Sequence, residues 1–194
     1  MKFTPKLGFT LPKQKYWEFF LIIAFPIHFW ALILWFQEFE TITERSNTWD
    51  AFGVGSYFMA YAFFESAIIF TILCFLMLLL PERLDKQTTF SVITVLYLVI
   101  ASWFILEQAR FLAIIPEDVW FFKRVQNIKS IKSKAGTVTA ITFALTIILP
   151  PIFLMKSKKF LNNIPSFLSR LTVLSSLYLA FDFLAILVII IRNV

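Results

Sequence analysis

Apolar residues occur along the chain in five long runs, separated by short polar stretches. Each run holds about 20 residues, enough for a helix to cross the roughly 30 Å hydrocarbon core of a bilayer. The predicted spans are residues 17–36, 56–80, 90–109, 138–155 and 171–191. The longest polar stretch, between the third and fourth runs, is too short to hold a core of its own. We therefore predict an all-α fold, a bundle of five transmembrane helices forming one integral membrane domain over residues 1–194.

The lysines before the first run resemble the start of a signal peptide. The run is too long for one, however, and it is followed by Gln37, Glu38, Phe39 and Glu40 instead of a small-residue cleavage site. We expect a retained helix. Ten of the 18 lysines and arginines flank the spans on the N-terminal side of the membrane and eight flank them on the other side. This excess predicts a multi-pass protein with a cytoplasmic N-terminus.

The composition excludes an ordinary soluble domain. The chain of 194 residues is 59% hydrophobic and 19% aromatic, with only 15% charged residues. Its net charge of +6 does not indicate nucleic-acid binding, because no RNA-binding motif is present and the aromatic residues lie mostly in the apolar runs. A single cysteine, Cys74, excludes a disulfide framework and a cysteine metal site.

Residues 116–134 have the pattern of a basic amphipathic helix in the lipid headgroup layer. Pro116 suits the first turn of a helix, and Gly136 suits its end. An apolar stripe runs through the segment, with Lys129, Lys132 and Lys134 on another face. We predict an interfacial helix whose lysines bind anionic lipid or an acidic partner. The alternative is a polar helical connector with no binding role.

Three titratable residues lie deep inside predicted spans, at one depth. At 1.5 Å per residue, His28 and Asp182 lie about 16 Å into their helices, and Glu65 about 14 Å into its own. An ionised group there costs about 3 kcal/mol, so such residues usually face inward and pair. We predict a midplane polar cluster, a candidate proton or solute site, formed by His28, Glu65 and Asp182 with Tyr61 and Tyr178 one turn away. The alternative is that these residues only hold helices together.

Two further features concern the third and first spans. Glu107 and Arg110 lie three residues apart at the outer end of the third span, which predicts a local ion pair. Alternatively, Arg110 contacts acidic residues of the first loop, a lipid phosphate or a partner carboxylate. Pro26 is expected to bend the first helix and free a carbonyl. Pro150 and Pro151 are expected to kink or stop the fourth helix.

No motif for catalysis is present. A bis-His haem needs two histidines and the chain has one, and neither a Gly-rich phosphate loop nor an HExxH motif occurs. We therefore assign no catalytic residue, no metal site and no cofactor, and favour a non-enzymatic role. The leading hypothesis is a non-catalytic subunit of a larger membrane assembly, packed against other subunits and membrane lipids. The alternatives are a small proton-coupled carrier or channel using the midplane cluster, and an intramembrane enzyme acting on a lipid-like substrate.

Overall fold

The structure, a computed structural model, describes residues 13–80, 85–112, 114, 135–156 and 158–194. Within these ranges the chain is helical and contains no strand, which confirms the all-α prediction. The predicted interfacial helix at 116–134, with Lys129, Lys132 and Lys134, lies outside the described residues. The helices are α1 (Lys13–Arg45), α2 (Thr48–Leu78), α3 (Lys86–Phe111), α6 (Ala135–Lys156) and α7 (Lys158–Asn193).

Among the described residues, four helices are long and apolar enough to cross a membrane: α1, α2, α3 and the Ser166–Asn193 part of α7. Helix α6 carries a shorter apolar stretch, Ile141–Phe153. The chain is therefore a multi-pass membrane protein. Each described helix also extends beyond its predicted apolar run at one end or both, as α1 does by continuing past Phe36 to Arg45. Polar residues at the ends of a span can remain helical, since their backbone groups still bond within the helix.

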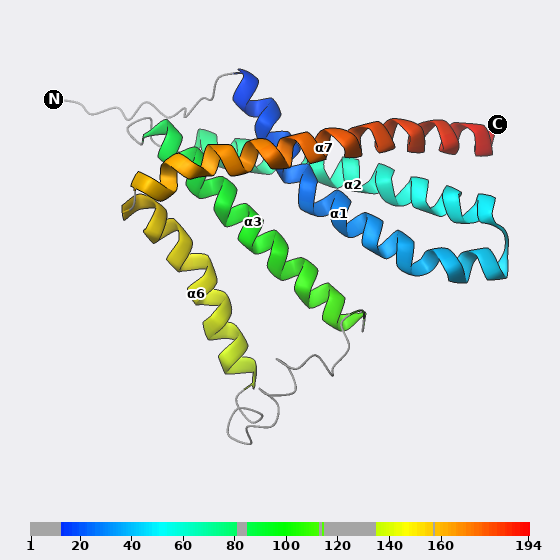
Figure 1. Ribbon diagram of the computed structural model, residues 1–194, viewed down its shortest axis with the longest axis horizontal. Coiled ribbons are helices and arrows are strands. Elements are labelled where there is room, and N and C mark those ends of the chain that lie inside the picture. Colours follow the sequence, from blue (N-terminus) through cyan, green and yellow to red (C-terminus); the bar gives the residue numbers. More distant parts are fainter. Residues whose placement is uncertain (1–12, 81–84, 113, 115–134, 157) are drawn as a thin grey trace.

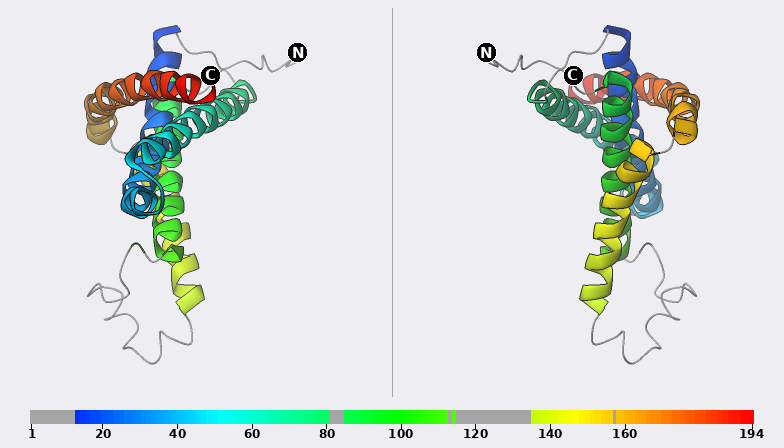
Figure 2. Two further views of the ribbon diagram at one scale, coloured as in Figure 1. Left: turned by 90° about the vertical axis from the view of Figure 1, so that its right-hand side faces the viewer. Right: turned by 90° about the vertical axis from the view of Figure 1, so that its left-hand side faces the viewer.

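Helix α1 is the central helix of the bundle (Figures 1 and 2). It packs against α2, α3 and α7, whereas the backbones of α2 and α3 do not approach each other closely within the described residues. About 44% of the apolar window of α1 is buried, against 22% or less for the other spans. Helices α2 and α7 run beside α1, while α3 and α6 form a pair that leans away from them (Figure 1). The faces of α2, α3, α6 and α7 that point away from α1 remain largely uncovered.

The main core forms around the first half of α1. Phe19, Ile22 and Ile23 are almost fully buried there. The other buried members of this core come from α2, α3 and α7, namely Met77, Phe90, Tyr97, Leu168 and Leu171. Further along, α1 and α2 approach closely because Gly55 faces the Trp35 ring, and a Cβ at Gly55 would collide with it. The Trp35 Nε1–H group donates to the Ala51 carbonyl at 2.9 Å.

Pro26 lies inside α1, where it leaves the Ile22 carbonyl without its usual N–H donor. The neighbouring Ile23 carbonyl accepts a hydrogen bond from the Tyr97 hydroxyl of α3 at 2.7 Å. This bond ties α3 to α1 beside the proline. Pro150 and Pro151 also lie inside a helix, and α6 continues past them to Lys156. They do not stop it.

At the far end of the bundle, the last turn of α7 is fastened to the first turn of α2. The Arg192 guanidinium donates to the Trp49 carbonyl and to the Asp50 carboxylate, each at 2.7 Å. Asn47 caps α2 by accepting from the Asp50 N–H group at 2.9 Å. These contacts fix the start of α2 and the end of α7 to each other where α1 and α2 connect.

Tyr97→Phe is expected to lower the free energy of unfolding by about 1–3 kcal/mol, because it removes the hydroxyl donor of a buried carbonyl beside a proline. Thermal unfolding of the purified protein in detergent measures the change. Tyr61→Phe is the matched control, since Tyr61 is 71% exposed, and should unfold like the wild type. Equal stability of the Tyr97→Phe variant would show that the bond to Ile23 contributes nothing.

Candidate functional site

His28 of α1 and Asp182 of α7 meet in the interior of the bundle. The His28 Nε2 atom lies 3.1 Å from Oδ1 and 3.0 Å from Oδ2 of Asp182. The two residues are 154 positions apart in sequence, and their relative exposures are 0% and 4%. Two of the three residues predicted to share one depth therefore form a buried pair.

The number of protons on this pair follows from the hydrogen bond that the other ring nitrogen of His28 makes. The His28 Nδ1 atom lies 2.8 Å from the Ala24 carbonyl oxygen, one turn earlier in α1. A carbonyl can only accept, so Nδ1 carries a hydrogen. One further proton is then held between Nε2 and the Asp182 carboxyl group. Whichever atom holds it, the pair has no net charge, which suits a hydrocarbon environment.

Tyr178 covers one face of the imidazole. Its ring stacks on that of His28 with centroids 5.8 Å apart and an interplanar angle of 4°. The Tyr178 ring also contacts the Phe25 ring, with centroids 6.0 Å apart. Ser175, one turn earlier in α7, is fully buried and donates to the Leu171 carbonyl at 2.9 Å. Tyr178 therefore shields one side of the pair.

Glu65 and Tyr61, the other members of the predicted cluster, do not join the pair. Helix α2 presents a stripe of small and flexible residues to the bundle, in which Met59, Ala62 and Ser66 are buried. Glu65 lies off this stripe and is exposed, as is Tyr61 at 71%. Close packing of α2 favours the small side chains inside. The predicted depth of Glu65 matches that of His28 and Asp182. Its side chain nevertheless lies on the outer face of α2, away from the pair.

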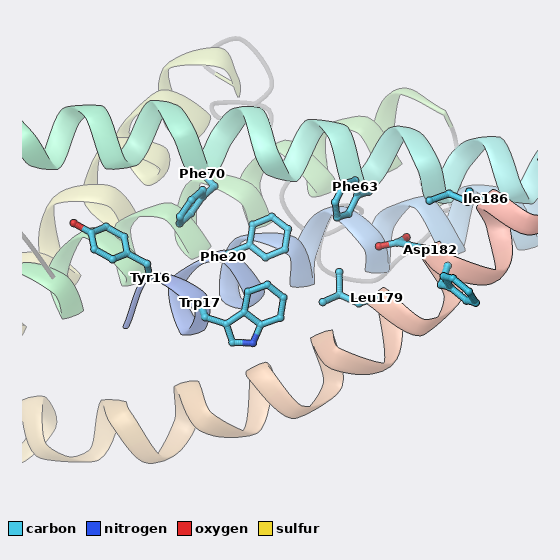
Figure 3. Close-up of a pocket in the computed structure, with 9 residues that line it drawn as sticks. Tyr16, Trp17, Phe20, Phe63, Phe70, Leu179, Asp182 and Ile186 are labelled. Carbon is cyan, nitrogen blue, oxygen red and sulfur yellow. The ribbon is translucent and has the colours of Figure 1, made fainter. Parts of the chain in front are cut away.

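An apolar groove reaches Asp182 from the outside of the bundle (Figure 3). It has a volume of about 620 Å³ and lies between α2 and α7, with α1 behind it. Aromatic rings from α1 and α2 form much of its lining, and Asp182 is its only acidic residue. The lining residues are Tyr16, Trp17, Phe20, Phe63, Phe70, Leu179, Asp182, Phe183 and Ile186. The groove can hold an apolar chain with one end near the buried pair.

The predicted local pair at the end of α3 is present. The Arg110 Nη1 atom lies 3.0 Å from a carboxylate oxygen of Glu107, and both side chains are 47% exposed. Such exposed pairs contribute little to stability. The pair lies at the surface, away from the buried His28–Asp182 contact.

Several contacts between helices were not predicted from the sequence, and two of them join distant segments to each other. The bond from Tyr97 to Ile23 joins α3 to α1, and the Arg192–Asp50 pair joins α7 to α2. The Arg192–Asp50 pair could have been expected from the predicted topology, because that topology places both residues on the same side of the membrane. For Tyr97 the only signal is a phenol in the middle of a span, which needs an acceptor when buried.

Asp182→Ala should lower the free energy of unfolding by about 3 kcal/mol or more, because it leaves the buried His28 ring without the partner of Nε2. Asp182→Asn should stay much closer to the wild type, since its amide can donate to Nε2. The double variant His28→Leu with Asp182→Leu should recover most of the loss. Chemical or thermal unfolding in one detergent compares all four proteins. A stable Asp182→Ala variant would rule out a structural role for the pair.

The site can therefore hold one proton between two bonded side chains and can contact an apolar molecule through Asp182. Among the described residues, no three His, Cys, Asp or Glu side chains gather in a way that could hold a metal ion. The chain matches no family model, no curated protein and no solved structure.

Proposed function

We propose that the chain is a non-catalytic membrane subunit that assembles with the transmembrane helices of other subunits. The observation that carries this proposal is the position of Glu65. It lies near the middle of α2, and its side chain points out of the bundle. It forms no hydrogen bond or ion pair with any residue that the structure describes.

An outward carboxyl group at mid-membrane is energetically unfavourable in a lone protomer. An ionised side chain at this depth costs about 3 kcal/mol or more in contact with lipid. Glu65 is close enough to Tyr97 of α3 for a Coulomb interaction, but the Tyr97 hydroxyl is already committed to Ile23. A basic or strongly hydrogen-bonding group from another helix would remove the cost.

The surface around Glu65 suits a helical partner. Large side chains on the same side of α2 are exposed at intervals of three and four residues, the spacing of a helix-packing seam. They are Tyr57, Tyr61, Phe64, Ile68 and Ile72. A partner helix packed along this seam would bring its own polar residue to the depth of Glu65.

The buried pair supports the same proposal from inside the protomer. His28 is fully buried and both of its ring nitrogens are bonded. The pair then acts as a tie between α1 and α7, not as an open reaction centre. The polar groups inside the protomer are thus satisfied, whereas the outward Glu65 carboxyl group is not. This combination suits assembly with a partner helix.

The proposal is tested with the full chain in lipid vesicles and a polyleucine transmembrane peptide that carries one central lysine. Energy transfer between labelled protein and labelled peptide should show association, weakened about tenfold or more by Glu65→Gln. Glu107→Gln is the matched control, because it removes a carboxylate at the end of a span, and should bind the peptide normally. Equal association of wild type and Glu65→Gln contradicts the proposal, as does a purely monomeric mass after mild extraction from the native membrane.

A second candidate is an intramembrane enzyme acting on a lipid-like substrate, which the groove beside Asp182 favours. The groove would hold the apolar chain, and the carboxyl group would exchange a proton with the substrate. Conversion of a lipid by the wild-type protein, lost in Asp182→Asn, would support this candidate. A carrier built on all three midplane residues has less support, because Glu65 does not face the pair.

A further inference from the structure

The apolar groove between α2 and α7 has the make-up of a ligand site (Figure 3). Sites for small molecules have volumes of roughly 300–1,000 Å³ and combine an apolar lining with few polar groups. The groove, at about 620 Å³, fits this description. Tyr16 and Trp17, in the first turns of α1, lie toward one end of it, and Asp182 lies toward the other. No lining residue belongs to the seam around Glu65, so the groove is a separate site from that seam.

The Asp182 carboxyl group can accept a further hydrogen bond. Among the described residues its hydrogen-bond partner is the His28 Nε2 atom, which lies 3.1 and 3.0 Å from the two carboxyl oxygens. Two carboxyl oxygens together offer about four lone-pair sites, so a single partner leaves most of them unused. Asp182 is only 4% exposed, and it lines the groove. A donor that lies in the groove is therefore placed to reach these sites.

The charge and the depth of the site favour a neutral donor. His28 and Asp182 together carry no net charge, so the pair does not offset the charge of an ammonium or a phosphate group. The other lining residues are uncharged as well. Asp182 lies near the middle of the Ser166–Asn193 span, where an ionised group is unfavourable. A hydroxyl group donates a hydrogen bond and brings no charge to this depth.

We infer that the groove binds a long-chain alcohol, a neutral lipid with one hydroxyl group at the end of an apolar chain. The hydroxyl group donates to a carboxyl oxygen of Asp182. The chain lies along Phe20 and Phe63 toward Trp17. Bilayer lipid is as apolar as the groove lining, so the hydrogen bond at Asp182 is what selects this ligand. A phospholipid keeps its headgroup at the membrane surface and would place only hydrocarbon beside Asp182.

The test reconstitutes the full chain in phosphatidylcholine vesicles with hexadecanol that carries a photoreactive diazirine in its chain. Illumination should attach the probe to residues that line the groove, as mapped by mass spectrometry of the digested protein. Unlabelled hexadecanol should compete at about tenfold lower concentration than hexadecyl methyl ether, which has the same chain and no donor. Hexadecyl sulfate and hexadecyltrimethylammonium carry permanent charges and should compete no better than the ether.

Two variants locate the site. Leu179→Trp fills the groove and should lose the labelling of its lining residues. Leu177→Trp is the matched control, because it places the same ring at a position of α7 that is 59% exposed and outside the groove, and it should be labelled like the wild type. The double variant His28→Leu with Asp182→Leu removes the acceptor, so hexadecanol and the ether should compete equally. Melting temperatures show that each variant is folded.

Three outcomes would overturn the inference. Equal competition by hexadecanol and the ether in the wild type would mean that Asp182 accepts no bond from the ligand. Labelling that Leu179→Trp leaves unchanged would indicate ordinary contact with bilayer lipid. Labelling of the groove in vesicles but not in the native membrane would assign the groove to a partner subunit. Association through Glu65 is measured separately and shares no residue with this site, so failure of that experiment leaves this result unaffected.

Discussion

The fold depends on the fact that hydrocarbon offers no hydrogen-bond partners. Each polar group placed in the bilayer must therefore be satisfied by the chain itself or by another molecule. The His28–Asp182 pair meets this requirement with no net charge, and it does so by joining α1 to α7. Helix α1 can then lie at the centre with α2, α3 and α7 around it. The same requirement accounts for the Tyr97 bond beside Pro26.

Two groups of polar residues can be distinguished by this requirement. The first is satisfied within the protomer and includes His28, Asp182, Tyr97 and the buried serines that bond to their own helix. The second is represented by Glu65, which forms no hydrogen bond or ion pair with a described residue. Members of the first group account for how the helices hold together. Glu65, in the second group, is where we expect another molecule to contact the chain, near the middle of the membrane.

The sequence predicted the helical class, because long apolar runs are a strong signal, and it predicted the depth of His28 and Asp182 from the helical rise. It did not predict which side of α2 faces inward. Depth depends on residue count alone, whereas the buried face depends on which side chains fit between helices. On α2 the small residues Ala62 and Ser66 lie inside, so Glu65 cannot. Helix ends were also predicted too short, as at Arg45, since hydropathy reports membrane contact and not helix length. The groove beside Asp182 follows from packing between distant segments, which no local pattern encodes.

The separation of 154 residues between His28 and Asp182 has a consequence for biosynthesis. At roughly 5–20 residues per second, a ribosome needs about 8–30 s to add the intervening chain. During this time the first span has entered the membrane while its imidazole lacks the carboxyl group that it contacts in the finished bundle. The imidazole must therefore find other polar partners, in the insertion machinery, in water or in lipid headgroups, until α7 is made. Synthesis of α7, and not membrane entry of α1, is the event that lets this pair form.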